Sequence, residues 1–207
     1  MDELIQGFRR FRAEVWPRER ERFQALSQRG QRPRAMVIAC SDSRVDPQMI
    51  FSAAPGELFI VRNVANLVPP YAPDAAYHGT SAALEFGVRA LGVEQIIVMG
   101  HALCGGVQTL LHGAPAQVRD FVEPWMRIAD AARRRAIMRE PAETRQEACE
   151  QETVRLSLEN LGTFPWINEA VEARRLTLHG FYFDIRSGVL LHLGSNQAFE
   201  SVLKPGK

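Results

Sequence analysis

Two short apolar runs, each ending at or near a cysteine or histidine, constrain this chain more than any other feature. The runs Ala35–Cys40 (AMVIAC) and Gln95–Met99 (QIIVM) have the length and composition of buried strands. Segments with helical spacing accompany them, such as Ser81–Leu91, which is followed by Gly92 at the expected helix C-terminus. Strands that alternate with helices indicate a mostly parallel central sheet flanked by helices on both faces. We therefore predict an α/β fold.

The remaining segments extend this fold at both ends. Residues 1–29 predict a helical arm with apolar side chains on a polar background. Such an arm would stand exposed alone, so we expect it to pack on the domain or on another subunit. Glu57–Val61 is a further predicted strand, and Leu176–Asp184 with Val189–Leu193 predict a C-terminal β-hairpin. Because no linker interrupts the pattern, we predict a single domain for the whole chain, with the arm followed by an α/β core over residues 30–207.

Composition argues against several function classes. The 25 Lys and Arg residues nearly balance the 24 Asp and Glu residues, which leaves a formal net charge of +1 and no basic stripe for nucleic acid. No stretch approaches the ~18 apolar residues of a membrane span, and the N-terminus lacks the apolar region of a secretory signal. Three cysteines without an export signal argue against a disulfide framework and leave thiolate chemistry open. We expect a cytoplasmic protein with neither a nucleic-acid nor a membrane partner.

Two polar motifs accompany the two apolar runs: CSDSR at residues 40–44 and GHALCG at residues 100–105. Open α/β sheets bind ligands at the carboxyl ends of their strands, so Cys40 can meet His101 and Cys104 there. Two thiolates and an imidazole make a three-ligand zinc site whose fourth position is left for water. Taken singly, a strand-end cysteine, a His-x-x-Cys pair or an Asp–Arg ion pair is commonplace. Together, at matching strand ends, they favour a metal site.

These two motifs resemble the signature motifs of beta-class carbonic anhydrases. The resemblance continues through PGELF (55–59), RNVANLVPPY (62–71), GTSAALEF (79–86), NLGTFPW (160–166) and HGFYFD (179–184), and so covers roughly residues 30–190. It implies that Cys40, His101 and Cys104 bind one zinc ion per chain. It also implies that Asp42 and Arg44 form the catalytic pair.

A substrate pocket beside the zinc is implied by the same resemblance. Gln31 resembles a glutamine that hydrogen-bonds the substrate in plant-type members, and the backbone N–H of Gly105 would be a second donor. Phe59 and Val64 would form apolar walls. Phe86 stands where plant-type members carry a tyrosine, so the wall is kept and a hydroxyl is lost.

One further position separates two groups within this family. Some bacterial members bind bicarbonate at a regulatory site that needs a tryptophan three residues before the first zinc cysteine, and they can close the site by placing the catalytic aspartate on zinc. Val37 occupies that position here. We therefore expect an open, plant-type-like site. A crystal structure near neutral pH with Asp42 bound to zinc would contradict this expectation.

The implied activity is the zinc-dependent reversible hydration of carbon dioxide to bicarbonate and a proton, by attack of zinc-bound hydroxide on CO2. The protein would then be a carbonic anhydrase, a lyase with a small-molecule substrate, working as a homodimer or an assembly of dimers. A zinc hydrolase of carbon disulfide or carbonyl sulfide on the same fold is the main alternative. Two others are a Cys–His nucleophilic enzyme, whose thiolates zinc would block, and a structural zinc protein, which needs a fourth protein ligand.

Overall fold

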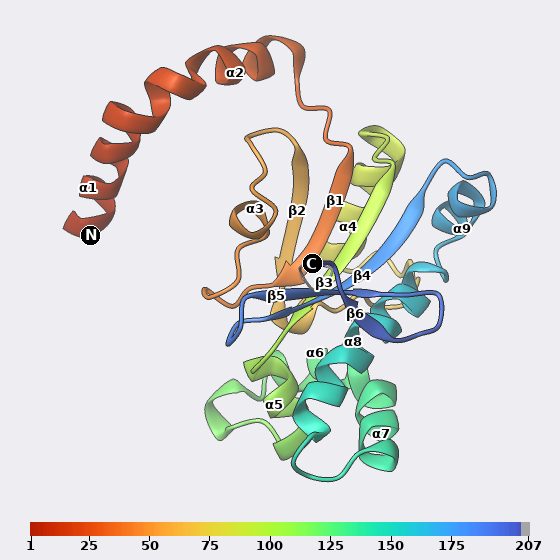
Figure 1. The fold of residues 1–207 in the computed structure, drawn as a ribbon. Helices are drawn as coiled ribbons and strands as arrows, with labels where there is room; N and C mark the ends of the chain where they lie inside the picture. Colours follow the sequence, from red (N-terminus) through yellow and green to blue (C-terminus); the bar gives the residue numbers. More distant parts are fainter. Residues whose placement is uncertain (204–207) are drawn as a thin grey trace.

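A six-stranded sheet forms the centre of the protein in the computed structural model, which describes residues 1–203 (Figure 1). The strand order is β2-β1-β3-β4-β5-β6. The first four of these strands are parallel to one another, and β5 and β6 are added antiparallel. The bounds are β1 (Ala35–Cys40), β2 (Leu58–Asn63), β3 (Gln95–His101), β4 (Thr177–Asp184), β5 (Val189–Leu193) and β6 (Phe199–Ser201). The predicted α/β class with a mostly parallel sheet and a C-terminal hairpin is confirmed.

Strand β1 is buried on both faces, which explains its unbroken apolar sequence. Met36 and Ile38 belong to the core on one face of the sheet, and Val37 and Ala39 to the core on the other. Cys40 ends the strand opposite the last residue of β2. Because β1, β2 and β3 run in parallel, the side chains that end these strands gather at one edge of the sheet.

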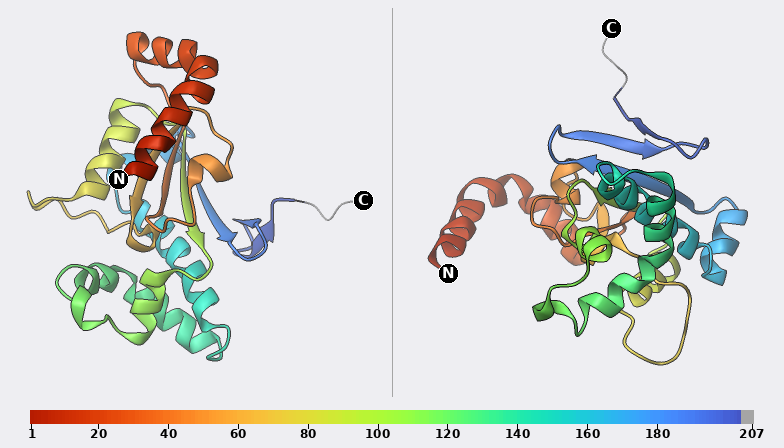
Figure 2. Two further views of the ribbon diagram at one scale, coloured as in Figure 1. Left: turned by 90° about the vertical axis from the view of Figure 1, so that its left-hand side faces the viewer. Right: turned by 90° about the horizontal axis from the view of Figure 1, so that it is seen from below.

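The longer helices of the α/β core cover the sheet on one face and beyond that edge, and the short helix α3 packs against the other face (Figures 1 and 2). Helices α4, α8 and α9 contribute buried side chains to the core shared with Met36 and Ile38. Helices α5, α6, α7 and α8 form a second core, which includes Cys40 and Cys104. The bounds are α3 (Pro47–Ile50), α4 (Gly79–Glu85, continued by a π-helical turn over 86–90), α5 (Gly105–His112), α6 (Val122–Met126), α7 (Asp130–Arg139), α8 (Arg145–Leu161) and α9 (Pro165–Glu172).

The N-terminal segment projects away from the sheet (Figure 1; Figure 2, right). It consists of α1 (Asp2–Arg10), a π-helical turn over 11–15 and α2 (Trp16–Arg29). None of its residues is buried, and Leu4 and Phe8 are 75% and 60% exposed. An apolar surface of this kind on a projecting helix is typical of a contact with another chain.

Two details differ from the predicted elements. Strand β2 runs to Asn63 rather than Val61, so Arg62 and Asn63 reach the carboxyl edge of the sheet. Strand β6 was not predicted, because three residues are too few to give a period-two pattern. Within residues 1–203, no helix has the length and apolar character required to span a bilayer.

Candidate metal centre

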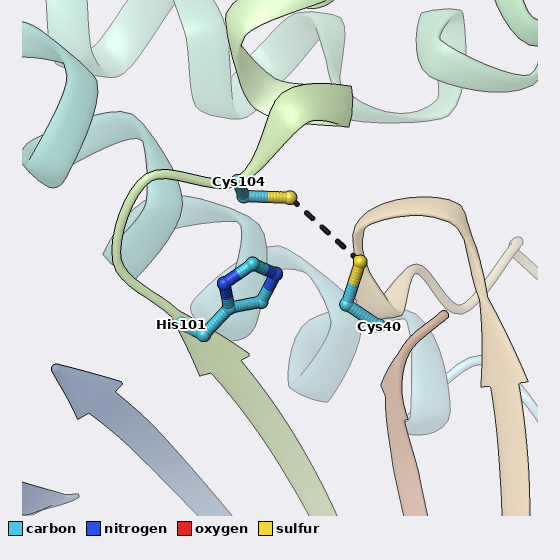
Figure 3. A group of neighbouring side chains, drawn as sticks. All are labelled: Cys40, His101 and Cys104. Carbon is cyan, nitrogen blue, oxygen red and sulfur yellow. Dashed lines mark hydrogen bonds between the residues drawn. The ribbon is translucent and has the colours of Figure 1, made fainter. Parts of the chain in front are cut away.

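Two strand ends and one turn bring Cys40, His101 and Cys104 together (Figure 3). Cys40 is the last residue of β1, His101 is the last residue of β3, and Cys104 directly precedes α5. The three potential ligand atoms lie within 4.8 Å of one another, and all three residues are buried. Side chains that the sequence holds far apart thus converge at the carboxyl edge of a parallel sheet, as the motif positions predict.

The spacing of these atoms fits a tetrahedral zinc ion. The two sulfurs are 3.9 Å apart, and Zn–S bonds of about 2.3 Å at a tetrahedral angle separate two sulfurs by about 3.8 Å. The Nδ1 of His101 lies 2.9 Å from the carbonyl oxygen of Ala102 and can donate to it. Its Nε2 is buried, has no hydrogen-bond partner within residues 1–203, and is turned toward the sulfurs in Figure 3. A ring fixed through one nitrogen with the other left free is the usual state of a histidine that binds a metal.

The hydrogen bond between the two sulfurs shifts the pKa values of both thiols. A hydrogen bond from Cys104 lowers the pKa of the Cys40 thiol, and the same bond, together with burial, raises the pKa of Cys104. Burial lowers the pKa of His101, but the interactions with Cys40, the Ala102 carbonyl and Asp42 together outweigh it and leave that pKa raised. A divalent cation would stabilise both thiolates at once, because it binds only the deprotonated sulfur.

Asp42 and Arg44 form a forked ion pair beside this centre. The Nε of Arg44 donates to Asp42 Oδ1 at 2.9 Å, and its Nη2 donates to Oδ2 at 2.6 Å. The backbone N–H of Arg44 adds a third bond to Oδ1. These hydrogen bonds hold the pKa of Asp42 well below its usual range. Asp42 Oδ2 lies 4.0 Å from His101 Nε2, so the carboxylate is next to the centre while Arg44 occupies both of its oxygens.

Residues 102–104, called here the ligand turn, connect the centre to this pair. Leu103 adopts a left-handed conformation with φ 58°, which is costly for a leucine, and its side chain is 48% exposed. The carbonyl oxygen of Leu103 accepts a hydrogen bond from Arg44 Nη2 at 2.9 Å. One turn therefore carries a thiol ligand and also holds the guanidinium that fixes Asp42.

Two of the predicted pocket residues adjoin the centre within one chain. Gly105 follows Cys104 at the start of α5. Val64 packs in the same cluster as Cys40 and Cys104. A Cβ at Gly106 would come within 2.8 Å of the Val64 side chain, so this close approach of α5 requires glycine.

The other three predicted pocket residues lie elsewhere in the same chain. Gln31 is next to residues 90–94, at the edge where β1 begins, and six residues of β1 separate the two edges by roughly 16 Å. Phe59 pairs with Met36 rather than with Cys40, and its ring contacts that of Phe86 at 6.0 Å between centroids. Within one chain, these three side chains are not brought to the metal centre.

Two charged side chains near the centre, Arg62 and Glu150, were not predicted from the sequence. Arg62 donates to the carbonyl oxygens of Cys40, Asp42 and Val45 at 2.6–3.0 Å, and so holds the loop that carries Asp42. Glu150 of α8 accepts a hydrogen bond from the backbone N–H of Cys104 at 2.8 Å. A signal for Glu150 was present, since it falls on the buried face of α8 together with apolar residues. Its hydrogen-bond partner, Cys104, could not be predicted from the sequence, because the two residues are 46 positions apart.

An α/β sheet with two thiols, an imidazole and a held carboxylate at its carboxyl edge is the arrangement of a metal-dependent enzyme. Comparisons with known proteins agree. The profile of the family described as carbonic anhydrase matches residues 35–190. A carbonic anhydrase of Pseudomonas aeruginosa is 39% identical over 98% of this chain and 92% of its own length, and one of Synechococcus elongatus is 34% identical over 93% and 71%.

Solved structures agree as well. The beta-carbonic anhydrase CcaA superposes with a TM-score of 0.91 at 35% identity, over 97% of this chain and 98% of that one. One of two tetrameric beta-carbonic anhydrases from the fungus Sordaria macrospora superposes with a TM-score of 0.80 at 27% identity, over 93% and 96% of the two chains. The chain belongs to the beta-carbonic anhydrase family. It is a carbonic anhydrase.

Proposed function

We propose that this protein catalyses the reversible hydration of CO2 to bicarbonate and a proton, with one zinc ion held by Cys40, His101 and Cys104. The observation that carries the proposal is the convergence of these ligand atoms within 4.8 Å beside a carboxylate fixed 4.0 Å from His101 Nε2. Zinc bound there would supply a water with a lowered pKa, since zinc lowers the pKa of bound water from 15.7 to about 7 in well-studied sites.

Asp42 orients the nucleophile in this proposal. Its Oδ2, the oxygen near His101, accepts a hydrogen bond from the nucleophile and so directs a lone pair toward the carbon of CO2. Arg44 keeps the carboxylate in that position, because its Nε and Nη2 donate to the two carboxylate oxygens as a bidentate pair. The N–H of Gly105 donates to a substrate oxygen as charge develops on it, and Val64 forms an apolar wall of the pocket.

A second copy of the chain completes the pocket in this proposal. Gln31, Phe59 and Phe86 have the chemistry of a substrate-binding wall but lie away from the centre of their own chain. We assign them to the site of a neighbouring subunit in a homodimer or an assembly of dimers. The exposed apolar arm and the tetrameric relative support an oligomer. None of the three cysteines forms a disulfide, which supports a cytoplasmic location, and we propose that the whole chain acts as one domain.

The direct test is stopped-flow CO2 hydration by purified protein, with zinc measured on the same sample. We expect fast hydration at about one zinc per chain. Full zinc without hydration at any pH from mildly acidic to alkaline would overturn the proposed reaction. Carbonyl sulfide and carbon disulfide would then be the substrates to assay.

Sharing of the site between chains predicts complementation. Gln31→Ala and Asp42→Ala chains should each form defective oligomers. Co-assembled, they should regain activity, because one site of each mixed dimer combines an intact Gln31 with an intact Asp42. The measurement is the specific activity of separately tagged, co-purified chains relative to each single variant. Activity no higher than the average of the two variants would place Gln31 outside the site of a partner.

A further inference from the structure

Glu150 is a carboxylic acid in the interior of the protein, 2% exposed and on the buried face of α8. A buried carboxyl group is stable only when its oxygens are hydrogen-bonded. Three groups donate to it: the backbone N–H of Cys104 at 2.8 Å, Gln146 Nε2 at 2.7 Å and the hydroxyl of Tyr182 at 2.8 Å. All three groups donate a hydrogen bond to Glu150, so its carboxyl oxygens act only as acceptors.

These contacts hold both backbone polar groups of one metal ligand, the N–H and the carbonyl oxygen of Cys104. Glu150 Oε1 binds the N–H of Cys104, and Gln146 Nε2 also donates to the Cys104 carbonyl oxygen at 3.2 Å. Tyr182 of β4 donates to the other oxygen, Oε2, and so sets the direction of the carboxyl group. The backbone at Cys104 is thus anchored to α8 and β4, two elements that lie outside both sequence motifs.

What Glu150 anchors is a strained segment. The ligand turn contains Leu103 at φ 58°, a left-handed conformation that is unfavourable for a residue with a Cβ. Without a bond at its end, this turn can relax. Relaxation would move the Cys104 sulfur, and it would also move the Leu103 carbonyl that holds Arg44.

We propose that Glu150 is a positioning residue for the zinc centre: its bond to the Cys104 N–H holds the ligand turn in the geometry that binds metal and orients Arg44. This role rests on the zinc centre of the proposed function, but not on the reaction. It depends on the reach of the side chain to the Cys104 N–H rather than on its negative charge.

Two substitutions separate reach from charge. Glu150→Gln keeps the length and one carbonyl oxygen for Cys104, loses the charge, and can still pair with the Tyr182 hydroxyl, which rotates to accept. Glu150→Asp keeps the charge but is one methylene shorter, so it cannot reach both Cys104 and Tyr182. A matched control is Glu152→Asp on the same helix. Glu152 is 4% exposed, and its partners are the arginine side chains Arg135, Arg139 and Arg155 rather than the ligand turn.

The experiment measures zinc release to a chelator and the visible spectrum of the cobalt-substituted protein, with thermal unfolding recorded alongside. We expect Glu150→Asp to release zinc at least about 10-fold faster than the parent protein. The cobalt–thiolate bands of its cobalt-substituted form should also change. Glu150→Gln should stay within about 3-fold of the parent, and Glu152→Asp should lose stability while its release rate and spectrum stay unchanged.

Other outcomes overturn the proposal. If Glu150→Gln is the more defective of the two, the charge matters rather than the reach. If both variants release zinc at the parent rate, Glu150 is merely structural. A protein that holds zinc yet does not hydrate CO2 would overturn the proposed function alone, because the release rates and the cobalt spectra do not depend on the reaction.

Discussion

Replacement of Asp42 by alanine is expected to lower kcat/KM for CO2 hydration by about 10²-fold or more, while zinc stays at about one per chain. The variant removes the carboxylate oxygen 4.0 Å from His101 Nε2 and leaves all three ligand side chains in place. Arg44 loses its partner but keeps its bond to the Leu103 carbonyl. The measurement is stopped-flow hydration with zinc determined on the same sample.

Asp184 provides a matched control for this prediction. It forms a similar local pair, in which Arg186 donates to Asp184 Oδ1 through its backbone N–H at 3.1 Å and through Nε at 2.8 Å. Asp184→Ala removes an Asp-x-Arg pair from another strand end without touching the metal centre, so hydration should stay near the parent rate. An Asp42→Ala protein that retains most of its activity would remove Asp42 from the mechanism.

The second large effect is expected from Cys40→Ser, which should weaken zinc binding on the order of 10²-fold and reduce hydration in step with the zinc that is lost. A serine hydroxyl keeps its proton at neutral pH and is a poor ligand compared with a thiolate. Four-ligand zinc sites bind with about 10–16 kcal/mol, or roughly 3 kcal/mol per ligand, so the loss of one thiolate weakens binding on the order of 10²-fold. Zinc per chain, measured after dialysis against a chelator, should fall from about one to a small fraction.

The third cysteine is the natural comparison for that experiment. Cys149 is as buried as Cys40 and lies on α8, but it is not one of the three converging ligand residues. Burial raises its pKa to about 12, so it remains a thiol at neutral pH. Cys149→Ser should keep its zinc even if its thermal stability falls. Zinc retained by Cys40→Ser, or lost from Cys149→Ser, would mean that the ligand set is assigned wrongly.

Periodicity and motif position predict the parts of this protein that depend on local sequence. The strand Ala35–Cys40 is buried on both faces, so its apolar run is continuous and easily recognised. In the structure β1 pairs with β3 in parallel, and this pairing brings Cys40 near His101. Asp42 and Arg44 were assigned through the family resemblance, and their contacts are local because they are two residues apart.

The parts that could not be predicted depend on contacts between distant segments. Glu150 meets Cys104 across 46 residues, and no spacing rule connects a helix residue to a turn in another element. Arg62 meets Cys40 only because β2 runs two residues further than its apolar pattern indicates. The position of Gln31, by contrast, follows from the predicted strand itself, because a residue that precedes Ala35 lies at the opposite edge of the sheet from Cys40.

The pairing of two parallel strands also sets when the metal can bind during folding. Cys40 and Cys104 are 64 residues apart, and parallel strands cannot be joined by a hairpin, so their ends meet only after a long crossover has formed. Contacts of such long range form late and slowly. In small zinc modules the ion drives folding, since no site exists without it. Here we expect the sheet to assemble before the site exists, so metal uptake should report the completion of folding rather than its start.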